Sequence, residues 1–223
     1  MRFAWGSPRN KRGALRRVCL RQVRQKWRTF FVASPWLGAI LACASCSGGP
    51  DPDVKSSYPY GRYLGALELA ENPNAENVRQ IVELLSDPEP LVRSGAVVAL
   101  GKIGRAEFVQ HLIPLLDPQL EASALVRSDV CIAFQTLKNP QAIPQLLTCL
   151  RSDPEGAVRR EAAKGLPAFG KKDEILEALV QAIADPDPGA AWRAHLSLQE
   201  LTGAKEVAMT TEAWAAYLKD RRP

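Results

Sequence analysis

The sequence has few of the side chains that usually build metal-binding or nucleophilic sites. Its 223 residues include two histidines and five cysteines, and beyond residue 46 only His111, His195, Cys131 and Cys149 remain of these. No H-x-x-x-H spacing, no C-x-x-C spacing beyond residue 46, and no G-x-S-x-G or phosphate-binding glycine loop occurs. The sequence therefore predicts no catalytic residue, no metal site and no cofactor.

Acidic side chains are absent from the first 42 residues. This segment holds ten of the 29 basic residues, so 19 basic residues stand against 24 acidic ones in the rest of the chain. The first 42 residues thus account for the basic pI of the chain, and the remaining residues carry a small net negative charge. Binding of the phosphate backbone requires an excess of basic side chains, which residues 43–223 lack. We therefore predict that the protein does not bind nucleic acid.

The sequence also lacks a hydrophobic run of membrane-spanning length. Its longest apolar segment, residues 29–42, extends about 21 Å as a helix, whereas a bilayer core is about 30 Å thick. Pro35 interrupts this segment as well. Because a basic stretch precedes it, we predict that residues 1–42 form a signal peptide with a long basic n-region.

The signal peptide ends in a sequence that suggests lipid attachment. The stretch ILAC at residues 40–43 resembles a bacterial lipoprotein box, which implies lipidation of Cys43, with Cys46 as the alternative. Residues 43–57, rich in Gly, Pro, Ser and Asp, then form a flexible tether. We expect an exported protein anchored by lipid to a membrane of the bacterial cell envelope. A cut beside Cys43 that releases a soluble secreted or periplasmic protein is the alternative.

The motif DPEPLVRSGAVVALGKIG at residues 87–104 recurs three times. The further copies begin at Glu121, Asp153 and Asp185, at spacings of 34, 32 and 32 residues. In each copy, apolar or small residues fall at relative positions 0, 4, 7, 8 and 11, which is one face of an α-helix. A second amphipathic segment precedes each copy. Each unit is therefore a helix, a turn and a second helix.

These units predict an all-α protein whose hairpins stack into an α-α superhelix. One hairpin cannot bury its apolar face alone, and terminal units need atypical caps. We assign residues 58–223 to this domain, with an N-terminal half-repeat first and a capping helix at 210–221. The four repeats cover about residues 76–105, 106–139, 140–171 and 172–203.

Asp-Pro pairs begin three of the copies, at Asp87, Asp153 and Asp185. Aspartate is a favoured N-cap, and proline fits the first helical position. We therefore predict that these aspartates cap the second helices. The second copy has a longer link, and we expect residues 117–124 to bulge outward.

The pattern of Asp, Val-Arg and an Ala-rich helix resembles the HEAT-repeat family, in particular its short bacterial, lyase-associated variety. It is carried by Asp87 with Val92-Arg93 and by Asp153 with Val158-Arg159. The resemblance implies a HEAT-like solenoid in which acidic and arginine side chains form a ladder between successive turns. The ladder residues are Asp87, Arg93, Glu121, Arg127, Asp153, Arg159 and Asp185. The fourth copy departs from the pattern, since Ala191 replaces the arginine.

Cys131 and Cys149 fall on consecutive predicted helices. An exported protein can oxidise such a pair to a disulfide. The alternative is two buried free thiols that pack as small apolar side chains. His195 lies beside the apolar positions, and we expect it to be a partly buried structural residue.

The absence of catalytic motifs favours a non-enzymatic interaction or scaffold module, displayed as an envelope lipoprotein, that binds an unidentified protein. We expect the second helices to line the binding face, with Trp192 as its strongest contributor. The candidate face consists of Val98, Ile132, Arg160, Lys164, Trp192 and Leu196. The resembled family includes bilin lyases, so a maturation enzyme acting on a tetrapyrrole is one alternative, and a structural spacer is another.

Overall fold

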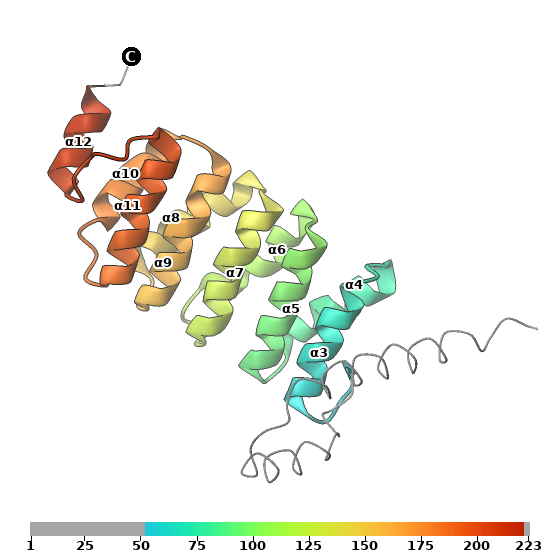
Figure 1. The fold of residues 1–223 in the computed structure, drawn as a ribbon. Coiled ribbons are helices and arrows are strands. Elements are labelled where there is room, and N and C mark those ends of the chain that lie inside the picture. The colour runs from blue at the N-terminus through green and yellow to red at the C-terminus, as the bar shows by residue number, and fades with distance from the viewer. Residues whose placement is uncertain (1–51, 221–223) are drawn as a thin grey trace, which may run out of the picture. The chain divides into compact units, whose positions relative to one another are not determined.

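The computed structural model of the chain describes residues 52–220. The predicted signal peptide, Cys43, Cys46 and most of the tether lie outside the described residues. Within 52–220 every regular element is helical, which confirms the all-α superhelix (Figure 1). None of the helices in this part of the chain is both long and apolar enough to span a bilayer.

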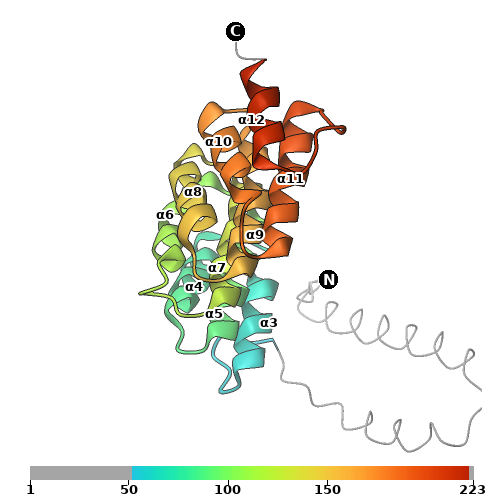
Figure 2. The same cartoon turned by 90° about the vertical axis from the view of Figure 1, so that its left-hand side faces the viewer.

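The helices of residues 52–220 stack in two rows (Figures 1 and 2). The front row of Figure 1 contains α3 (Pro59–Leu69), α5 (Pro90–Ile103), α7 (Ala124–Leu137), α9 (Gly156–Gly165) and α11 (Pro188–Thr202). The row behind contains α4 (Ala75–Glu83), α6 (Val109–Leu112), α8 (Ile143–Ser152) and α10 (Asp173–Ala182), and α12 (Thr211–Lys219) follows at the C-terminal end. Short 3-10 turns flank these helices at Leu84–Ser86, Ala106–Phe108, Ile113–Leu116, Pro140–Ala142 and Leu166–Phe169. Consecutive front-row helices pack against each other, so the stack is continuous.

The second helices begin later than the capping prediction placed them, and that prediction is wrong. Helix α5 begins at Pro90 with Glu89 as its N-cap, and α11 begins at Pro188 with Asp187. A residue before proline is pushed into extended conformation, which keeps Glu89 and Asp187 out of the helix. Asp87 instead accepts the backbone N–H of Glu89 over 3.0 Å.

Apolar side chains of both rows form one core. Val92, Val126 and Val158 occupy equivalent positions in successive second helices, and all three are fully buried. Close approach between front-row helices depends on small residues. A Cβ added at Gly95 would lie 2.6 Å from the ring of Tyr63, so α3 and α5 meet where only a glycine fits.

The C-terminal end of the stack is covered by α12. Its Trp214 is fully buried, and its indole Nε1 donates a hydrogen bond to Nδ1 of His195 over 3.0 Å. The left-handed Gly203 (φ 76°) ends α11 and lets the chain turn toward α12. The apolar end of the fourth repeat is therefore sealed by a helix from outside the repeats.

Candidate functional site

The acidic and arginine residues of the repeats pair between neighbouring turns. Each arginine lies near the start of a second helix, and its acidic partner lies in the turn before the next one. The nitrogen to oxygen distances are 2.7 Å for Arg62–Asp87, 2.6 Å for Arg93–Glu121, 2.8 Å for Arg127–Asp153 and 2.7 Å for Arg159–Asp185. We call these four pairs the ladder. Sequence reasoning missed Arg62, although its place six residues after Ser56 repeats the spacing of Arg93 from Asp87.

Every ladder arginine donates four hydrogen bonds. Nε and Nη2 donate to the two oxygens of the carboxylate, and Nη1 donates to the carbonyls five and six residues earlier. This bidentate geometry fixes the register between turns. Arg127 and Asp153 are 2% and 1% exposed, so loss of either side chain would strand a buried charge.

Three carboxyl groups of the ladder, those of Asp87, Glu121 and Asp185, have pKa values shifted toward the charged form. Burial alone would raise the pKa of Asp87, Glu121 and Asp185, but hydrogen bonds from arginine and from a backbone N–H outweigh it. The pKa of each carboxyl therefore lies below its ordinary value. Such groups stabilise the fold above the pKa of the unfolded chain and lose that effect as the pH falls below it.

The ladder ends in neutral residues on both sides. Ser56 occupies the position of the ladder acids and accepts the backbone N–H of Tyr58 over 3.2 Å, as Asp87 does for Glu89. At the other end, Ala191 stands where the earlier copies have arginine. No ladder charge is left without its partner among the described residues.

The longer second link bulges away from the stack. Leu120 in this link is 73% exposed, while Glu121 turns inward and is 1% exposed. The backbone carbonyl of Glu121 accepts Nη1 of Arg127 over 2.8 Å. The extra residues thus lie outside the ladder, and glutamate takes the place that aspartate holds elsewhere.

The residues of the predicted binding face lie on the exposed side of α5, α7, α9 and α11, which we call the second-helix face. Val98, Ile132 and Trp192 are 38%, 41% and 54% exposed. Arg160 and Lys164 are also exposed, and Leu196 is half-buried. Sequence reasoning missed Leu91 and Leu125, exposed at equivalent positions of α5 and α7.

A half-buried carboxyl group lies in the middle of the second-helix face. Burial raises the pKa of Asp129, Glu161 raises it further, and a hydrogen bond from Ser94 opposes the shift. The Ser94 hydroxyl lies 2.5 Å from Oδ2 of Asp129 and links α5 to α7. This serine and aspartate therefore bridge two helices in the middle of the face.

His195 forms part of an aromatic cluster at the C-terminal end. Its ring lies 5.7 Å from Trp192 on one side and 5.7 Å from Trp214 on the other, and Trp214 stacks edge-on against Tyr217. Because Nδ1 accepts the Trp214 N–H, the neutral ring carries its proton on Nε2. Burial lowers the pKa of His195, which favours this neutral form.

Cys131 and Cys149 are buried free thiols in this structure. A hydrogen bond with Cys149, together with burial, raises the pKa of Cys131 well above its ordinary value. Of the two predictions for this pair, a disulfide or two buried free thiols, the structure has the free thiols. Across residues 52–220, no group of three His, Cys, Asp or Glu side chains is placed to hold a metal ion.

Comparisons with known proteins agree with this architecture. A family model described as HEAT repeats matches residues 54–121, 118–199 and 143–216. Among solved structures, a crystal structure of an engineered protein is similar, with a TM-score of 0.52 and 18% identity over 75% of this chain and 85% of the other. At this identity the similarity concerns the fold alone.

Curated relatives are named as enzymes. The chain is 32% identical over 126 residues to the deoxyhypusine hydroxylase of Candida albicans, a match that covers 55% of this chain and 38% of the relative. It is 34% identical over 119 residues to the deoxyhypusine hydroxylase of Coccidioides immitis, covering 50% and 36%. The chain therefore spans little more than a third of the length of these relatives.

These relatives overturn the functional prediction. The prediction that the protein is a non-enzymatic scaffold, and not an enzyme, is wrong, because the matched proteins are hydroxylases by name. The tetrapyrrole-lyase and spacer alternatives gain no support from them. The repeat pattern led to the wrong function because the recurring apolar positions depend only on how the helices pack. An enzyme built from such repeats has the same apolar positions.

Proposed function

The chain belongs to the HEAT-repeat family, and from this we propose that it acts in deoxyhypusine hydroxylation as a part that binds the polypeptide substrate. The relatives that carry this name match 126 and 119 residues of this chain, about half of its length. The proposal assigns binding of the substrate to residues 52–220.

The observation that carries the proposal is the row of exposed apolar side chains on the second-helix face. Val98, Ile132 and Trp192 come from three different helices of one row and are all more than a third exposed. Covering such side chains removes apolar area from water, worth about 25 cal/mol per Å². A row of stacked helices presents these side chains on one surface, with Arg160 and Lys164 of α9 between them, and such a surface suits an extended or helical segment.

Calorimetric titration of the full chain tests the proposal. The probes are a peptide that carries deoxyhypusine and the same peptide with lysine at that position. We expect tighter binding of the deoxyhypusine peptide, and Trp192→Ala should weaken it by about tenfold or more. Leu120→Ser is the matched control, because Leu120 is exposed in the link outside the face.

Two results would overturn this proposal. One is equal affinity for the two peptides, and the other is binding that Trp192→Ala and Leu120→Ser change equally. Mass spectrometry of the peptide after incubation with the chain, dioxygen and a reductant adds a direct readout. A gain of one oxygen atom would extend the assignment from substrate binding to the reaction itself.

We also propose that the protein is exported and held at a membrane by lipid on Cys43. The ILAC stretch and the apolar run before it support this, and they lie outside the described residues. Detergent phase partitioning of the expressed chain tests it. Wild type and Cys46→Ala should enter the detergent phase, and Cys43→Ala should stay in the aqueous phase. Detergent partitioning of Cys43→Ala but not of Cys46→Ala would instead identify Cys46 as the anchor.

A further inference from the structure

Two arginines of the second-helix face make far fewer hydrogen bonds than the ladder arginines. Arg160 donates a single long hydrogen bond of 3.5 Å to Glu161, its neighbour in sequence. Arg193 donates none, and its buried Nε has no partner among the described residues. A guanidinium has five N–H donors, and a buried donor without an acceptor is unfavourable. Because Nε of Arg193 is buried, the donors that the two side chains offer to an outside acceptor are those of their Nη groups, for which no hydrogen bond occurs among the described residues.

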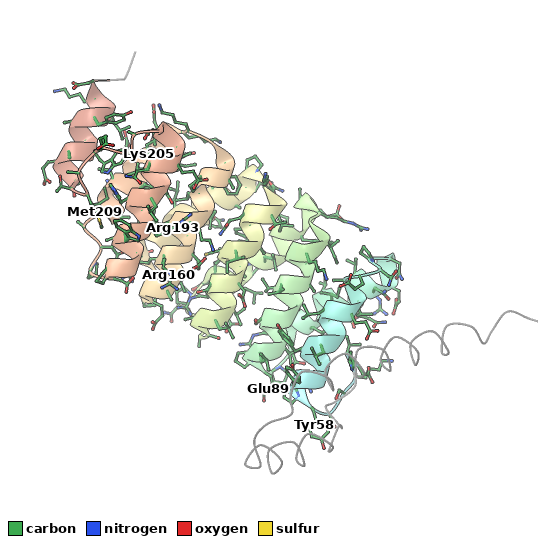
Figure 3. The ribbon with its side chains drawn as sticks, viewed as in Figure 1. Tyr58, Glu89, Arg160, Arg193, Lys205 and Met209 are labelled. Carbon is green, nitrogen blue, oxygen red and sulfur yellow. The ribbon has the colours of Figure 1, made fainter. Side chains whose placement is uncertain are left out.

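The two arginines lie at the boundary between α9 and α11. The Nη1 and Cδ atoms of Arg160 lie 3.6 Å from the position that a Cβ of Gly189 would occupy. Arg193 follows Gly189 by four residues, which is about one turn of α11. Figure 3 shows both labelled arginines over the region where α9 and α11 meet. The Arg160 guanidinium thus lies against the first turn of α11, the helix that carries Arg193.

This boundary differs from the one between α5 and α7. Between α5 and α7, Ser94 faces Asp129 and donates to it. The equivalent residues between α9 and α11 are Arg160 and Arg193, so two cations stand where a hydroxyl meets a carboxylate. Like charges at neighbouring positions repel, and an anion between them removes that repulsion.

The acidic groups nearby do not satisfy these two guanidinium groups. Glu161 is shared between Arg160 and Lys164, the latter at 3.2 Å. Asp187 caps α11 by accepting the N–H of Ala190 over 2.7 Å. Glu200 is 61% exposed and lies 3.8 Å from Nη2 of Arg193, beyond hydrogen-bonding distance. The boundary therefore keeps donors for an acceptor from outside.

An aromatic side chain completes the surface. Trp192 is 54% exposed and lies next to Arg193 in sequence. Its ring is supported from behind by His195, at a centroid distance of 5.7 Å. A supported, exposed tryptophan beside arginines has the composition of binding hot spots.

We infer that Arg160, Arg193 and Trp192 form a corner that binds an acidic residue next to an aromatic or long apolar residue of a polypeptide. The carboxylate accepts hydrogen bonds from the two guanidinium groups, and the apolar neighbour packs on the indole. Residues 43–223 carry 19 basic and 24 acidic side chains, so this corner is a cationic spot on a mildly acidic body. The inference rests on the proposed function only for the polypeptide nature of the occupant.

Fluorescence anisotropy of a short labelled peptide tests the inference. The peptide carries paired glutamates beside a phenylalanine, and its two controls carry glutamine or lysine in place of the glutamates. We expect the glutamate peptide to bind about tenfold or more tightly than the glutamine peptide, and the lysine peptide not to bind. Added salt should weaken binding of the glutamate peptide.

Variants assign the binding to the corner. Arg160→Gln and Arg193→Gln should each weaken binding of the glutamate peptide by about tenfold. Arg151→Gln, on α8 of the other row, is the matched control and should leave binding unchanged. Arg160 is 48% exposed, so its variant keeps the test available if Arg193→Gln disturbs folding.

Separate outcomes refute this inference and the proposed function. Equal binding of the glutamate and glutamine peptides, or wild-type binding by both arginine variants, overturns the corner. A deoxyhypusine preference that persists in those variants leaves the proposed function standing. If the arginines are required but deoxyhypusine and lysine peptides bind equally, the corner stands and the proposed function fails.

Discussion

Nε1 of Trp214 and Nδ1 of His195 form a 3.0 Å hydrogen bond that joins α12 to α11. Trp214 is fully buried, although it lies outside the four repeats. The last repeat is therefore covered by a separate helix, whose Tyr217 and Leu218 also pack against the core. Two experiments follow from this bond.

Truncation after Gly203 should lower the melting temperature sharply. It removes Trp214 and exposes the apolar end of α10 and α11, and loss of a buried tryptophan side chain typically costs about 3–5 kcal/mol. Thermal unfolding followed by circular dichroism measures the effect. An unchanged melting temperature would show that α12 does not cap the stack.

Stability should fall in mildly acidic solution because of His195. Burial lowers its pKa in the folded protein below the ordinary 6.5. The unfolded chain then binds a proton at higher pH than the folded one. This contribution is complete above pH of about 6.5 and is lost as the pH falls through the lowered folded value.

Denaturant titrations of wild type and His195→Gln between about pH 8 and pH 5 check this expectation. Wild type should lose more of its unfolding free energy than the variant. The ladder carboxyl groups of Asp87, Glu121 and Asp185 are present in both proteins, so their effect on the unfolding free energy cancels in the comparison. Parallel pH curves for the two proteins would contradict the prediction.

The buried rung of the ladder should show strong coupling. Arg127→Met leaves Asp153 charged and buried, and we expect a loss of about 3–5 kcal/mol in unfolding free energy. The double variant Arg127→Met/Asp153→Asn should lose much less than the sum of the single changes. Arg79→Met, at an exposed pair on α4, is the control and should leave stability nearly unchanged. Additive losses would mean that the rung is not an interacting pair.

Gly95→Ala should destabilise the contact between α3 and α5. The new methyl group would overlap the ring of Tyr63, and overpacking of this kind typically costs about 1–3 kcal/mol. Tyr63→Leu in the same chain should recover part of the loss. Chemical denaturation of the single and double variants measures both effects, and a neutral Gly95→Ala would place α3 farther from α5.

Helical periodicity made the architecture predictable. Val92, Val126 and Val158 recur at the same place in each copy, and the same spacing that marks a helix face also marks the buried row. Helix starts were less predictable. Each second helix begins three residues after its aspartate, because Asp87, Asp153 and Asp185 accept the backbone N–H two residues on and do not cap the helix.

The candidate site was predictable only in part. Arg62 was missed because its copy has Ser56 in place of the acid, so the sequence signature was broken although the geometry survived. The unused donors of Arg193 could not be inferred from sequence, since they depend on which acids reach it across α9 and α11. The predicted function was wrong because the apolar positions that recur in each repeat reflect helix packing and carry no information about catalysis.

The outward link before α7 is longer than the corresponding links of the other repeats, yet α7 keeps its place in the row. Arg127 donates a hydrogen bond to the backbone carbonyl of Glu121, six residues earlier, so the arginine fixes the position of the chain from Glu121 onward. Whatever precedes residue 121 can grow without displacing the second helix. Loops grafted near Leu120 would thus be presented on a fixed frame, which makes this turn a natural place for new binding segments to arise.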